Sequence, residues 1–167
     1  MGTAIRKARH ELTLGGVGAI AFGIWLFIKN LMYPLFAGRY LTNTLGLDAL
    51  SAAEKKAFIL LWVLVGFFTM LLHLYIGLCA VSEGTGKAVR RRSVYLLLAG
   101  LLAAVSLFDL VFNLCNISSV SGSWLDWLCD VMMETVRGAN LAALLRAALR
   151  TRKLQDQMQE EAMAHAD

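Results

Sequence analysis

Six polar side chains lie within long apolar stretches of this 167-residue chain. They are three acids, a histidine, an arginine and an asparagine: His73, Asp109, Asn113, Asp130, Glu134 and Arg137. A charge in the middle of a membrane helix costs about 2.5–3.5 kcal/mol on insertion scales. Carboxylates that share a low-dielectric site do not both stay ionised, so one binds a proton or a cation enters. This chemistry predicts an intramembrane proton or cation site.

The spacing of these residues places several of them together. Asp130, Glu134 and Arg137 share one face of a helix, so Arg137 can offset the charge of Glu134. With a rise of about 1.5 Å per residue, Asp109 and Asp130 lie at similar depth, each roughly 10 Å below the membrane surface. We expect these two acids to share a polar space without a basic partner, between Asn113 and Glu134.

Three classes of function fit this set of side chains. The first is a proton- or cation-linked transporter or channel. The second is a non-catalytic membrane subunit, whose polar stripe on the last helix packs against itself or a partner membrane protein, because polar groups also join helices. Asp109 then meets Arg137 after a shift of one turn, and His73 is a satisfied core residue instead of a proton relay. The third is a membrane enzyme that uses Asp109 or Asp130 as a general acid or base.

Compact catalytic and metal-binding motifs are missing from the sequence. It contains no HExxH motif, and its three cysteines form no CxxC pair. The segment EGTGKA at 83–88 lacks the first glycine and the Ser or Thr of a phosphate-binding loop. We therefore expect no catalytic residue, no cofactor and no metal, and a role other than enzymatic catalysis.

The elements that position these residues are four apolar runs. Of the chain, 58% is hydrophobic and 17% is charged, against about 25% charged in soluble domains. The runs cover 12–33, 57–81, 94–115 and 124–149, and about 20 apolar residues suffice to cross a bilayer. We predict an all-α integral membrane protein, one domain over 1–167, with four transmembrane helices in an antiparallel up-down bundle. Residues 150–167 extend the last helix as a cytoplasmic tail.

Local signals set the expected ends of these helices. Pro34 predicts that the first helix ends at Tyr33, because the residue before a proline is driven from helical geometry. The sequence Ser51-Ala-Ala-Glu54 is a capping box that begins the second helix near Ala52. In the last run, the free-energy cost of inserting the charges into a bilayer exceeds the gain from its Leu and Val residues. This helix therefore needs a polar partner within the protein.

Basic residues predict the topology. The cluster Lys87, Arg90, Arg91 and Arg92, the basic leader and the segment 146–153 contrast with an uncharged turn at 117–123. Under the positive-inside rule both termini are then cytoplasmic, in the plasma or inner membrane. The net charge of +4 therefore reflects membrane topology, and we expect no nucleic-acid partner.

Small residues predict one helix contact. Gly15, Ala19 and Gly23 recur every four residues on the first helix, a pattern that allows helices to approach closely. The contact lies within the subunit or between subunits. The expected partners are the lipid bilayer and either further copies of this chain or another membrane subunit.

Overall fold

The computed structural model describes residues 2–36, 51–87, 92–115 and 124–164. These residues form four helices and no strand: α1 (Gly2–Phe36), α3 (Ala52–Gly84), α4 (Arg92–Cys115) and α5 (Trp124–Ala164). Within them, three stretches are long and apolar enough to cross a membrane, namely Gly2–Met32, Ala52–Gly84 and Ser93–Cys115. The predicted all-helical membrane fold is confirmed. Helix α5 is not among the three because charged residues interrupt it.

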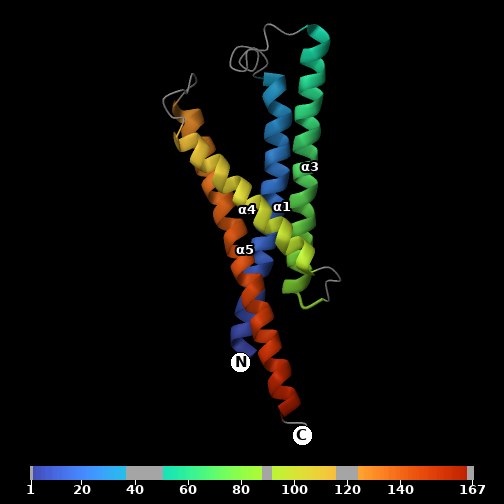
Figure 1. The fold of residues 1–167 in the computed structure, drawn as a ribbon, viewed down its shortest axis with the longest axis vertical. Helices are drawn as coiled ribbons and strands as arrows, with labels where there is room; N and C mark the ends of the chain where they lie inside the picture. Colours follow the sequence, from blue (N-terminus) through green and yellow to red (C-terminus); the bar gives the residue numbers. More distant parts are fainter. Residues whose placement is uncertain (1, 37–50, 88–91, 116–123, 165–167) are drawn as a thin grey trace.

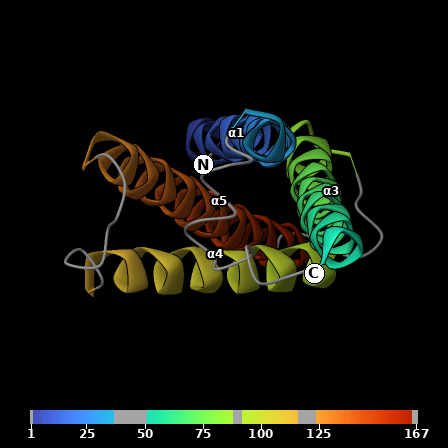
Figure 2. The ribbon, with the colours of Figure 1, turned by 90° about the horizontal axis from the view of Figure 1, so that it is seen from above.

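The helices alternate in direction, so α1 begins and α5 ends at the same end of the molecule (Figure 1). Helices α1 and α3 run side by side, and α5 contacts both α1 and α4. The α4–α5 pair is inclined to the α1–α3 pair (Figures 1 and 2). The two pairs diverge toward the end where α4 finishes and α5 begins. Helix α5 therefore packs against α4 within the tilted pair and also connects that pair to α1.

Glycines bring α1 and α3 together. A Cβ atom on Gly77 would lie 2.5 Å from the Gly16 carbonyl oxygen, and one on Gly23 would lie 2.6 Å from the Cβ of His73. A Cβ on Gly66 would lie 2.6 Å from the side-chain nitrogen of Asn30. These contacts follow one another along both helices, so a side chain larger than hydrogen would separate the two backbones.

A second set of contacts joins α1 to α5. A Cβ on Gly15 would lie 3.1 Å from the Cβ of Leu144, and the Asn140 amide donates to the Gly15 carbonyl at 3.2 Å. The three small residues singled out in the sequence thus lie at different contacts: Gly15 against α5, Gly23 against α3, and Ala19 in the core, 1% exposed.

The core occupies the half of the molecule that contains the start of α1 and receives side chains from all four described helices. Its buried members are Leu12, Ala19, Ile76, Ala80, Tyr95, Ala99, Leu144, Ala147 and Ala148. Large apolar side chains such as Leu60, Leu97 and Phe108 are instead exposed, at 69%, 68% and 69%. Exposed apolar faces of this size suit contact with lipid.

Helix boundaries agree with the sequence at one end and differ at another. The Ser51 hydroxyl accepts from the Glu54 amide at 3.3 Å, and Glu54 accepts from the Ser51 amide at 2.7 Å. The capping box and the start of α3 at Ala52 are confirmed. The predicted end at Tyr33 is wrong, because α1 continues through Pro34 to Phe36. A proline there removes only the bond to the Asn30 carbonyl, within the last turns of the helix.

Part of the topology signal falls outside the described residues. These omit Arg90, Arg91 and the turn 117–123, whereas Lys87 closes the second described segment and Arg92 begins α4.

We predict that Gly77→Ala lowers the stability of the protein by about 1–3 kcal/mol, as over-packing typically does. The added methyl group would meet the backbone of Gly16, which has little freedom to move. Gly100→Ala is the matched control, because nothing lies within 4 Å of its Cβ position, and alanine favours a helix. Thermal unfolding of both variants in the same detergent measures the difference; equal stability would contradict the close contact.

Candidate functional site

Polar side chains gather at three levels of the molecule. Lys29 and Asp130 form the Lys29 layer, and Glu83, Tyr95 and Arg152 form the Glu83 layer. The Arg137 layer lies between them and contains His73, Ser106, Asp109, Glu134 and Arg137. On α1, the Arg9 carbonyl lies beside Gly84, at the level of the Glu83 layer. Lys29 is 20 residues further along α1, or about 30 Å, which is the thickness of the hydrocarbon core.

The Lys29 layer joins α1 to α5 by an ion pair. The Lys29 ammonium contacts the Asp130 carboxylate, and their side chains are 37% and 49% exposed. The expectation that Asp130 lacks a basic partner is therefore wrong. The pairing depends on how α5 is rotated toward α1, which the spacing of residues along α5 alone does not fix.

Arg137 is the centre of the middle layer and joins α5 to α4. Its Nη2 atom lies 2.6 Å from Glu134 Oε2 and 3.6 Å from Asp109 Oδ2, and its Nε donates to the Ser106 hydroxyl at 3.3 Å. The Ser106 hydroxyl in turn lies 3.0 Å from Glu134 Oε2. The Arg137 guanidinium is therefore surrounded by Ser106 and Asp109 from α4 and by Glu134 from α5.

Asp109 also differs from the expectation drawn from the sequence. It faces Arg137, so it has a basic partner. This is the contact that the second class of function predicted, in which Asp109 meets Arg137 after a shift of one helical turn. Its side chain is 47% exposed, whereas Arg137 and Glu134 are 11% and 16% exposed. Asn113 lies near the end of α4, where its backbone carbonyl accepts from the Trp127 indole at 3.1 Å.

His73 is fully buried on α3, against Gly23 of α1. Its Nδ1 atom lies 2.9 Å from the Thr69 carbonyl oxygen. A carbonyl only accepts, so Nδ1 is the donor in this contact, and in the neutral ring Nε2 then holds a free lone pair. Among the described residues no hydrogen-bond partner for Nε2 is found. His73 therefore presents a buried basic nitrogen.

The Glu83 layer was missed in the sequence. The Glu83 side chain is fully buried in the last turn of α3, where the Tyr95 hydroxyl donates to it at 2.5 Å and Arg152 Nε lies 3.9 Å away. Three helices thus meet at one carboxylate. The sequence did contain a signal for this contact. Glu83 is a lone acid after an apolar run, Tyr95 lies in the first turn of the next helix, and Arg152 lies in the basic tail.

An apolar section separates the middle layer from the Glu83 layer. It contains Leu12, Ile76 and Leu144, each at most 1% exposed. In the part of the chain that the structure describes, no three His, Cys, Asp or Glu side chains are placed to hold a metal ion. The polar layers can therefore pair helices, exchange protons locally or face a partner, but within the described residues they do not form one polar path.

We predict that Arg137→Leu destabilises the protein by about 3–5 kcal/mol, because it leaves Glu134 buried without its counter-charge. The double variant Arg137→Leu/Glu134→Leu should recover most of this loss. Unfolding in detergent of the wild type, both single variants and the double variant measures the coupling. Additive effects of the two substitutions would show that Glu134 and Arg137 do not form a coupled ion pair on α5.

We also predict that reversing one charge of the Lys29–Asp130 pair weakens the protein and that reversing both restores it. Lys29→Glu places two acids together, whereas Lys29→Glu/Asp130→Lys recreates the pair with the opposite polarity. The folded fraction after heating, measured by size-exclusion chromatography, reports the effect. If the double variant were no more stable than the single one, α5 would not lie beside α1 in this register.

The geometry of the three layers is the basis for assigning a function, since no family model, no curated protein and no solved structure matches this chain.

Proposed function

We propose that this chain is an assembling membrane subunit, whose charged surface on α4 and α5 is covered by a second copy of the chain or by another membrane protein. The observation that carries the proposal is the exposure of paired charges. Asp109 and Asp130 remain 47% and 49% exposed although each has a basic partner. Asp109 lies on α4, whose other exposed side chains include Phe108 and Phe112.

Lipid is a poor cover for these side chains. An exposed charge in the hydrocarbon region costs several kcal/mol, so such groups face protein or water. Water from the opposite side is kept out by the buried section with Ile76 and Leu144. A polar stripe on a neighbouring helix supplies hydrogen bonds without a water-filled path. Assembly is therefore the cover that fits the exposed carboxylates best.

The subunit role includes a membrane crossing by α5. That helix contacts Lys29 through Asp130 and Glu83 through Arg152, which lie 22 residues, or about 33 Å, apart. The contacts at both ends match the hydrocarbon thickness. We infer that α5 is the fourth span and that its charges are tolerated because α1 and α4 neutralise them. The basic residues near Lys87 and Arg150 then favour cytoplasmic termini in a cell membrane.

The assembly prediction is tested by expressing the full chain with two different tags in one cell. After extraction into nanodiscs, we expect one tag to recover the other, or to recover a distinct membrane protein in fixed proportion. Asp109→Leu should weaken this recovery, whereas Leu97→Ala, an exposed change distant from the charges, should leave it intact. A stable wild-type monomer in nanodiscs, without any second chain, would remove the proposal.

Proton- or cation-linked transport is the second candidate. Three acids, Asp109, Asp130 and Glu134, surround two bases, Lys29 and Arg137, so one negative charge is left over. The buried Nε2 of His73 adds a proton acceptor at the level of the middle layer. Such a group can bind a proton or a cation at the divergence of the helix pairs.

Flux into liposomes that enclose a pH-sensitive dye tests this second candidate. We expect Asp109→Asn to assemble normally, because the amide resembles the protonated acid, and to abolish any proton-linked flux. Arg137→Leu should instead impair assembly. If Asp109→Asn failed to assemble while Arg137→Leu assembled, Asp109 would be a structural anchor and transport would be dropped.

A further inference from the structure

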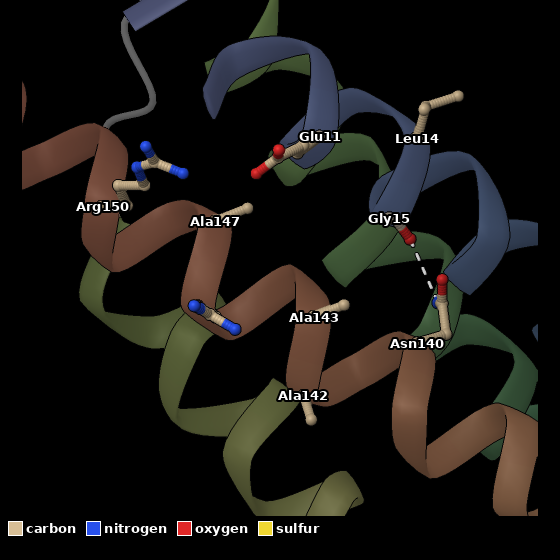
Figure 3. Close-up of a pocket in the computed structure, with 9 residues that line it drawn as sticks. Glu11, Leu14, Gly15, Asn140, Ala142, Ala143, Ala147 and Arg150 are labelled. Atoms are coloured by element: carbon tan, nitrogen blue, oxygen red, sulfur yellow. Dashed lines mark hydrogen bonds between the residues drawn. The ribbon is translucent and has the colours of Figure 1, made fainter. Parts of the chain in front are cut away.

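A groove lies between α1 and α5, at the end of the molecule that contains the Glu83 layer. This open groove has a volume of about 710 Å³, within the range of small-molecule sites. Gly15 and Ala143 line its floor and Leu14 lines its α1 side. The Asn140 amide beside them donates one hydrogen bond to the Gly15 carbonyl (Figure 3). The lining here therefore combines small apolar residues with one amide.

The mouth of the groove carries charge. Arg146 and Arg150 both line it and, four residues apart on α5, share one face. Both are exposed, and neither has an ion pair or a hydrogen bond within the part of the chain that the structure describes. Glu11 of α1 faces Arg150 across the opening (Figure 3). The mouth thus holds two cationic donors on one side and one acceptor on the other.

The depth of these arginines restricts what they can bind. Arg152 lies in the Glu83 layer, and Arg146 is six residues, or about 9 Å, further toward the middle of the protein. An arginine just inside the hydrocarbon region extends its side chain to reach an anion at the interface. The abundant anion at that depth is the phosphate of a membrane lipid.

We propose that this groove binds one phospholipid. The headgroup phosphate lies between Arg146 and Arg150 as a charge-assisted hydrogen-bond acceptor. One acyl chain covers Gly15 and Ala143 beside Leu14. Glu11 accepts a hydrogen bond from the rest of the headgroup, so an ammonium or hydroxyl donor, as in ethanolamine or glycerol headgroups, is preferred to the trimethylammonium of choline. This site does not depend on the assembly role proposed above.

The test uses the full chain in mixed micelles that contain equal amounts of phosphatidylglycerol, phosphatidylethanolamine and phosphatidylcholine. Native mass spectrometry counts the lipids that each protein retains. We expect the wild type to retain one lipid with the first two headgroups. Arg146→Gln/Arg150→Gln should lower this retention about tenfold or more, since each basic residue near the surface strengthens binding severalfold.

Three further variants separate a built site from general charge. Arg6→Gln/Lys153→Gln removes the same charge at exposed positions outside the groove and should keep the lipid. Glu11→Gln should keep a lipid but lose the discrimination against choline. Ala143→Leu fills the floor and should reduce retention of all three lipids while leaving the helix content unchanged.

Several results would overturn the proposal. These are equal retention by the wild type and the Arg146/Arg150 variant, equal loss in the charge-matched control, and a second protein chain in the groove instead of a lipid. Should the Arg146/Arg150 variant fail to fold, Ala143→Leu decides: unchanged lipid retention by that variant also overturns the site.

Discussion

The buried guanidinium of Arg137 is the constraint on which the arrangement of α4 and α5 depends. Arginine keeps its charge at any accessible pH and offers donors in a fixed plane, so it must be surrounded by acceptors. Ser106, Glu134 and Asp109 supply them from two helices. Rotating either helix would leave a charge in an apolar setting. The polar contacts therefore set the orientation of a helix that hydrophobicity alone would not hold in a membrane.

The two helix pairs are joined by different physics. Helices α1 and α3 meet through glycines such as Gly16 and Gly77, where the contact is backbone against backbone and gains from van der Waals packing. Helix α5 is joined to its neighbours by the ion pairs Lys29–Asp130 and Asp109–Arg137 and by the buried carboxylate of Glu83. The first kind of contact is close and uniform along the helices. The second is concentrated at particular depths and leaves the space between these depths apolar.

The sequence predicted the helices because each apolar run and the Ser51 cap are local signals. It failed at Pro34, where a tertiary setting tolerates a proline near a helix end. Within the candidate site, the Glu134–Arg137 contact followed from spacing on one helix. The partners of Asp109 and Asp130 did not, because they depend on the tilt of α5 and its rotation toward α1. Glu83 was overlooked because its burial arises only when α3, α4 and α5 converge.

Helix α5 is unbroken from Trp124 to Ala164, about 60 Å of rigid rod at 1.5 Å per residue. It contacts α1 near its middle, where Leu144 lies against Gly15. The same helix is also held on both sides of that contact, at Asp130 and Arg137 on one side and at Arg152 on the other. A tilt of about 10° about the Leu144 contact would move the helix axis at Asp130 by roughly 4 Å, enough to separate that carboxylate from Lys29. The long helix is therefore fixed in one tilt, because any other tilt would pull apart charged groups at more than one depth at once.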